Sequence, residues 1–195
     1  MARITKAVEE RRQEIIDIAR EFFIENGFDK TQMADISKKM GVAQGLVYHY
    51  FKSKTEIYYA VIDSIVEEKM QIAKRVLSGM EGSALDKIKA LSASHQPFDD
   101  NEELITRLVS DPAIIEYSKR KMSTSFIPLL LSLIEQGNAD GSFNCKYPKE
   151  TAMFILQGMT GIATELSSYP QEKENIITAS TDIIFRVLGI VPPSS

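Results

Sequence analysis

The chain has 195 residues, of which 44% are hydrophobic and 26% charged, with a formal net charge of −4. This is the balance of a soluble globular protein, and the length allows one compact unit or two small ones with a sizeable core. An internal disulfide is excluded, because Cys145 is the only cysteine. A membrane span is excluded too, because the apolar stretches 127–134 and 152–163 are shorter than the roughly 18 residues that a span needs.

The charge is not spread evenly along the chain. Residues 1–55 hold 10 basic and 8 acidic side chains, whereas residues 56–195 hold 13 and 19. Residues 36–55 contain four lysines and no acid. Such a local basic patch can face phosphate while the rest of the chain stays acidic, although a solvated surface is the usual meaning of a few lysines. The first ten residues have no signal-peptide pattern, and we expect a cytoplasmic protein.

Apolar spacing predicts helices along nearly the whole chain. The first helix ends at Asn26-Gly27, because glycine closes a helix without strain. Thr31 is the predicted N-cap of a short second helix, Gly41 ends that helix, and Ser53 caps the long fourth one. The expected bounds of helices two, three and four are 32–40, 44–51 and 54–77.

Glycine and proline divide the second half of the chain in the same way. Asp111-Pro112 starts a helix with proline at its first position, and residues 137–141 form a turn. The expected helices of this half are 84–93, 102–109, 112–136, 148–168 and 170–188. The predicted fold class is therefore all-α, with about nine helices and no strand.

The first three predicted helices, residues 8–53, contain a helix-turn-helix by physical criteria. Two short helices must cross steeply, and Gly41 tolerates the positive φ that so tight a turn needs. Ile36 and Met40 on one side of the turn, with Val42 and Val47 on the other, supply apolar contact. The second helix must present polar groups to DNA.

The sequence itself resembles a known family here. The stretch TQMADISKKMGVAQGLVYHYFKSKTE, residues 31–56, is similar to the DNA-binding signature of the TetR family of repressors, and YHYFKSK at 48–54 is especially characteristic. The resemblance covers about the first quarter of the chain. It implies a helix-turn-helix domain over 1–53 and a helical ligand-binding and dimerisation domain over 54–195. Ala43 departs from the family, which often has a capping Ser or Thr there.

The resemblance also implies contact roles in the first domain. Gln44 suits an adenine edge, Gly45 lets the backbone approach DNA, and Leu46 could touch a thymine methyl. Hydroxyls and lysines would contact phosphate. The alternative for the aromatic residues is a place in the core. The predicted DNA contacts are Thr31, Gln44, Gly45, Leu46, Tyr48, His49, Tyr50 and Lys54.

The last two predicted helices, 148–168 and 170–188, are the expected dimer surface. Gly158, Gly161 and Ala163 allow close approach of a helix, and the final helix has an apolar stripe that includes Ile183 and Leu188. Two such helices from each chain would form a four-helix bundle with two-fold symmetry. The alternative is that both helices pack only within the monomer.

An effector pocket is implied by the resemblance, because family members bind ligands in their C-terminal domain. Met and Phe side chains give an adaptable apolar lining, although each is more often plain core. We expect no cofactor and no metal. The candidate effector contacts are Met70, His95, Phe98, Met122, Phe126, Met153 and Gln157.

The predicted function is that of a repressor. It would bind a palindromic operator as a homodimer and leave DNA when a small, largely apolar molecule binds. An activator with the same DNA-binding domain and a helical interaction module are the alternatives. An enzyme is not expected, because no metal-spacing motif, phosphate loop or nucleophile elbow occurs. For Cys145 an inert thiol is a simpler reading than a redox sensor.

Overall fold

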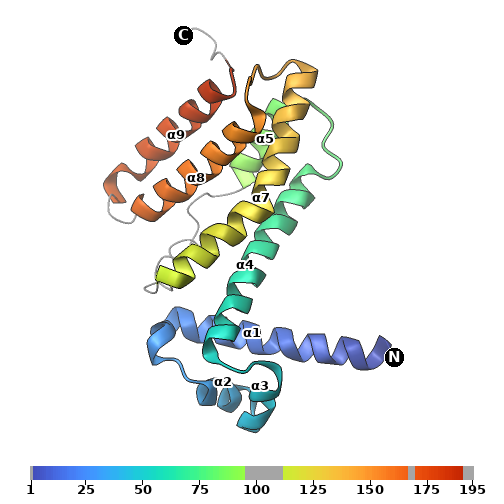
Figure 1. The fold of residues 1–195 in the computed structure, drawn as a ribbon, viewed down its shortest axis with the longest axis vertical. Helices are drawn as coiled ribbons and strands as arrows, with labels where there is room; N and C mark the ends of the chain where they lie inside the picture. Colours follow the sequence, from blue (N-terminus) through green and yellow to red (C-terminus); the bar gives the residue numbers. More distant parts are fainter. Residues whose placement is uncertain (1, 95–111, 167–169, 191–195) are drawn as a thin grey trace. The chain divides into compact units, whose positions relative to one another are not determined.

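The computed structural model describes residues 2–94, 112–166 and 170–190. These residues are helical with short connections and contain no strand, as the all-α prediction requires (Figure 1). Contacts divide the chain into two compact units. The head unit holds the residues up to Glu68 and the start of α7 up to Ser118, and the second unit holds the rest. None of the helices that the structure describes is both long and apolar enough to cross a membrane.

The head unit follows the predicted helix order. It contains α1 (Ala2–Lys30), α2 (Met33–Met40), α3 (Gln44–Tyr50) and the first part of α4 (Lys54–Leu77). Gly27 interrupts α1 with a φ of 78°, at the predicted helix end. Ser53 caps α4 as predicted, since its Oγ accepts the Glu56 N–H at 3.1 Å.

The predicted cap of the second helix is wrong by one residue. Gln32, and not Thr31, is the N-cap of α2. The Asp35 carboxylate turns back and accepts the Gln32 N–H at 2.9 Å, which satisfies one of the free donors of the first turn. Thr31 could not cap the helix, because its side chain is directed into the interior, where it is only 1% exposed.

The head has its own apolar core. Three aromatic rings pack together in it: the ring centroids of Phe23 and Phe28 each lie 5.0 Å from that of Tyr58. Edge contacts of this kind stabilise a core beyond the burial of apolar area. Besides Phe23 and Tyr58, the large side chains that are fully buried in the described part of the head are Ile15, Ile16, Ile36, Val47, Phe51, Ile57, Ile65 and Ile114.

The second unit contains most of the remaining helices. These are α5 (Ala84–Ser94), α7 (Pro112–Asp140), α8 (Pro148–Leu166), the short 3-10 helix η1 (Pro170–Glu172) and α9 (Lys173–Val187). Two predicted bounds are wrong: α7 continues through Gly137 to Asp140, and α9 begins only after the 3-10 turn. The predicted helix 102–109 lies outside the described residues.

The core of this unit gathers around the connection between α7 and α8. The ring of Phe143 lies against Gly137 of α7, and Leu188 at the end of α9 is fully buried in the same cluster. Cys145 is buried there too, and its Sγ lies 3.2 Å from Thr151 Oγ1. The Leu188 carbonyl accepts the Asn144 N–H at 3.0 Å, which ties the connection to α9.

Asp140 links the same connection to α5. One carboxylate oxygen accepts the Ala84 N–H at 2.8 Å, at the start of α5, and the other accepts the Ser142 N–H at 2.9 Å. Hydrogen bonds from Ser142 and from the Ala84 main chain hold the pKa of this carboxyl below its ordinary value. The charged form of Asp140 therefore stabilises the fold.

We predict that Asp140→Asn reduces the acid sensitivity of folding. A carboxyl with a lowered folded pKa contributes stability above its unfolded pKa, and this contribution is lost as the pH falls through the folded value, below about pH 4. The variant should be less stable than the wild type at pH 7, and this difference should shrink toward pH 3. Urea unfolding across this pH range measures it. Equal differences at pH 7 and pH 3 would contradict the role of the charge.

Candidate nucleic-acid interface

The turn between α2 and α3 is closed by Gly41. Its φ of 68° and ψ of 30° lie in the left-handed region that glycine adopts without strain. The Gly41 N–H donates to Lys38 O and the Val42 N–H to Ser37 O, both at 3.1 Å. This pair of bonds is the Schellman ending of a helix, and it reverses the chain within two residues. The predicted tight turn is present.

Buried contacts hold α2 against α3. Ile36 and Val47 are both fully buried, one on each helix. Ser37 is 5% exposed, and its hydroxyl donates to Ala34 O at 2.9 Å, so a small polar residue fits the crossing without an unpaired group. Phe51, also fully buried, ends α3. The opposite side of α3 is thereby turned outward.

The outward side of α3 carries most of the predicted DNA contacts. Gln44, Gly45, Tyr48 and His49 are exposed, Tyr48 by 43%. Leu46 and Tyr50 are half-buried. Open space surrounds Gly45, where an added Cβ would have no neighbour within 4 Å. Thus one short helix presents an amide, a phenol and an imidazole to solvent.

Thr31 and Lys54 do not join this surface. The Thr31 hydroxyl donates to Gly27 O at 2.9 Å and Phe22 O at 3.2 Å, inside the head. The Lys54 ammonium donates to Phe28 O at 2.6 Å and Asp29 O at 3.3 Å, and lies 4.2 Å from the centroid of the Phe28 ring. Both side chains hold the segment that follows the break in α1.

Two basic residues beside α3 were absent from the predicted contacts. The Lys52 ammonium lies 3.2 Å from Tyr48 O and 3.5 Å from His49 O, at the carbonyl end of α3. A lysine after a helix commonly binds its last carbonyls, so the sequence held that signal. The Arg12 guanidinium lies 4.9 Å from the centroid of the Phe51 ring. No local pattern indicates this contact, because 39 positions separate the two residues (12 to 51).

The candidate effector residues lie on three helices, and the structure describes five of them. Met70 is buried on α4, Met122 and Phe126 are half-buried on α7, and Met153 is 45% exposed on α8. Gln157 of α8 donates from Nε2 to Ser123 Oγ of α7 at 2.9 Å, beside Met122 in sequence. His95 and Phe98 lie outside the described residues.

Exposed apolar side chains occur on α8, on α9 and just before α8. The two helices run side by side in the second unit (Figure 1). Phe154 is 62% exposed, an unusual value for a large apolar side chain. Leu188, which belongs to the predicted stripe of the last helix, is instead buried in the core. We call this set of exposed side chains the apolar face; its residues are Tyr147, Met153, Phe154, Ile183 and Val187.

Comparisons with known proteins agree with this geometry. A family model described as bacterial regulatory proteins, tetR family, matches residues 15–61. The transcriptional repressor KstR2 of Rhodococcus jostii (strain RHA1) is 28% identical over 160 residues, 78% of each chain. The fatty acid metabolism regulator protein of Bacillus subtilis (strain 168) is 29% identical over 136 residues, 66% of this chain and 68% of its own.

A solved structure extends the likeness over both units. The transcriptional regulator FadR from Bacillus subtilis, in complex with stearoyl-CoA, has 20% identity and a TM-score of 0.69. The alignment covers 92% of this chain and 99% of FadR. The family match begins within α1 and ends within α4, so it spans the helix-turn-helix completely.

Proposed function

We propose, from the premise that this chain belongs to the tetR family of bacterial regulatory proteins, that it represses transcription as an operator-bound homodimer and is released by a small molecule. It is a DNA-binding transcriptional regulator. The observation that carries the proposal is α3, which the Gly41 turn sets against α2 with its polar side outward. A regulator of this kind acts on DNA in the bacterial cytoplasm.

The proposed DNA surface is the outward side of α3. In it Gln44 reads a base edge, and the Tyr48 hydroxyl contacts phosphate, as does that of Tyr50. Gly45 and Leu46 bring the helix close to the groove, and His49 reaches either base or phosphate. Thr31 and Lys54 lie outside this surface and donate to main-chain carbonyls at the end of α1.

Gln44→Ala is expected to relax base preference at one position in each half-site, by roughly 1–3 kcal/mol of discrimination. Affinity is measured on the operator and on variants with single base changes. The fold should be unaffected, because Gln44 is exposed. An unchanged preference at every base would show that Gln44 reads no base.

Lys54→Ala gives the matched comparison for Gln44→Ala. It should weaken binding to all duplexes about equally, because neither a contact to phosphate nor a bond within the head reads a base. A phosphate contact, which the resemblance implies, requires the slope of affinity against salt to fall by roughly one unit. The observed bonds to Phe28 and Asp29 instead favour an unchanged slope, since they make Lys54 a support of the head.

The proposed effector is largely apolar and binds in the second unit. Met122 and Phe126 are one turn apart on α7, and Gln157 reaches that helix from α8. Methionine and phenylalanine adapt to an apolar ligand, and one amide can orient its polar end. FadR, which shares the fold, was solved with stearoyl-CoA, and this supports an acylated ligand as the first probe. Met70, Met153, His95 and Phe98 remain proposed contacts from the sequence.

Stearoyl-CoA is expected to weaken operator binding, and the operator to weaken stearoyl-CoA binding by the same factor. A coupling of 1–3 kcal/mol, about 5- to 150-fold, is the usual range. Calorimetry with and without the operator measures both sides, and Phe126→Ala serves as the variant with impaired effector binding and intact operator binding. Equal ligand affinity in both experiments rules out release by this ligand, and no binding at all rules out stearoyl-CoA as the effector.

The proposed homodimer forms through the apolar face of α8 and α9. Exposed Phe154 and Ile183 need a partner surface, and the exposed Gly158 and Gly161 of α8 allow another helix to approach closely. Two such helices from each chain would form a four-helix bundle with two-fold symmetry.

A further inference from the structure

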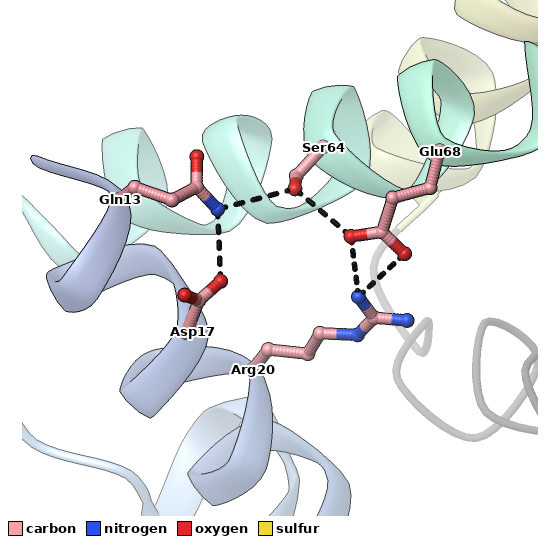
Figure 2. Close-up of polar contacts among 5 residues, drawn as sticks. All are labelled: Gln13, Asp17, Arg20, Ser64 and Glu68. Atoms are coloured by element: carbon pink, nitrogen blue, oxygen red, sulfur yellow. Dashed lines mark hydrogen bonds and ion pairs between the residues drawn. The ribbon is translucent and has the colours of Figure 1, made fainter. Parts of the chain in front are cut away.

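Five polar residues connect α1 to α4 in one continuous network (Figure 2). Gln13 Nε2 on α1 donates to Asp17 Oδ1 at 2.8 Å and to Ser64 Oγ on α4 at 3.5 Å. The Ser64 hydroxyl donates to Glu68 Oε1 at 3.3 Å. Arg20 Nη1 on α1 donates to the two carboxylate oxygens of Glu68, at 2.8 and 2.9 Å. The network thus ends in an ion pair between the two helices.

The spacing of these residues follows the helices themselves. Gln13, Asp17 and Arg20 are four and three residues apart, so they share one side of α1, and Ser64 and Glu68 share one side of α4 in the same way. The Arg20 side chain is only 20% exposed, whereas that of Glu68 is 49% exposed. An ion pair this accessible adds little to folding stability. The ion pair can instead contribute to the orientation of α4 relative to α1.

Glu68 lies far along α4 from the aromatic core of the head, so its ion pair is sensitive to the angle between α4 and α1. Glu68 follows Tyr58, whose ring packs on Phe23 in the head core, by ten residues (58 to 68). That separation is about 15 Å along a helix. A tilt of α4 about Tyr58 would therefore lengthen both hydrogen bonds between Arg20 and Glu68. Glu68 is also the last residue of α4 within the head unit, since Lys69 already belongs to the second unit.

We infer that Arg20 and Glu68 are positioning residues for operator binding. They fix the angle at which α4 leaves the head, and through it the separation of the two α3 helices in the operator-bound dimer. A dimer requires its recognition helices roughly 34–36 Å apart, or a multiple of one turn, to meet successive major grooves. This inference rests on the proposed function, because it needs both the dimer and the operator.

Charge reversal of each residue, singly and together, tests the inference. Arg20→Glu and Glu68→Arg should each lower affinity for a palindromic duplex by roughly five- to tenfold, and the exchange variant carrying both should recover most of the loss. The probe is the duplex that the wild-type protein selects from a random library. A general charge effect has opposite signs in the two single variants, since Arg20→Glu repels DNA and Glu68→Arg attracts it. A general charge effect therefore cannot weaken binding in both variants.

A duplex with one half-site separates positioning from damage to the head. Because α3 is unchanged, each single variant should bind this duplex with nearly the wild-type affinity. The only difference should be the general charge effect, which weakens binding of Arg20→Glu and strengthens that of Glu68→Arg. Glu25→Arg, at an exposed position of α1, carries the same charge change as Glu68→Arg and should not weaken binding to the palindrome. The inference is overturned if Glu68→Arg binds the palindrome as tightly as the wild type does, or if the exchange variant recovers no affinity. It is also overturned if both single variants lose as much affinity for the half-site duplex as for the palindrome. Failure of the wild type to select any duplex would instead refute the proposed function.

Discussion

Gly137→Ala is expected to destabilise the second unit by about 1–3 kcal/mol or more, although alanine is the better helix former. An added Cβ would overlap the Phe143 ring, with Phe143 Cγ only 2.6 Å away. The ring cannot retreat easily, because it is 5% exposed within the core cluster. Elsewhere in a helix the same substitution would gain about 1 kcal/mol. Urea unfolding followed by circular dichroism measures the free energy of unfolding.

A double-mutant cycle with Phe143→Ala identifies the cause. Phe143→Ala alone leaves a cavity and should cost about 3–5 kcal/mol. The double variant should be no less stable than Phe143→Ala, because the added methyl group of residue 137 then fills part of the space left by the ring. If the two losses simply add, the overlap with Phe143 is not the source of the effect of Gly137→Ala.

Phe154→Glu is expected to convert the dimer into a monomer and to weaken operator binding by about 10²–10⁴-fold. Phe154 is the most exposed residue of the apolar face, so the monomer should tolerate a charge there. A dimer interface would bury that charge without a partner, which is strongly unfavourable. Each head would then bind its half-site without the high effective concentration that the dimer provides. Light scattering and anisotropy on the selected palindrome report the two effects.

Ile24→Glu is the matched control for Phe154→Glu. Ile24 lies on α1, is 41% exposed, and is not part of the apolar face. This control should remain a dimer. Should Phe154→Glu also remain a dimer at micromolar concentration, the apolar face is not where two copies meet.

Local rules predicted most helix ends correctly. Gly41 ends α2 in the left-handed conformation, Gly27 breaks α1 with a positive φ, and Ser53 caps α4 through its side chain. Each of these depends on residues within a few positions, where the sequence holds all the necessary information. The end of α7 was misjudged because Gly137 suggested a turn. Gly137 instead lies within α7, where its missing side chain leaves room for the Phe143 ring. The sequence pattern does not reveal this packing contact.

The sequence by itself determined the helical fold class and the helix-turn-helix, since periodicity, a turn glycine and the stretch 31–56 are all local signals. The tertiary structure decided which way individual side chains face. Ile183 with Val187 and Ile184 with Leu188 both fit helical spacing, so only the packing of α9 shows that Leu188 is buried and Ile183 exposed. Lys54 was predicted at a phosphate, yet its ammonium lies on carbonyls 25 and 26 residues away. Arg20 and Glu68 meet across 48 residues. Contacts between distant segments exist only once the helices pack, because helical periodicity records which side of a helix is apolar but not what lies against it.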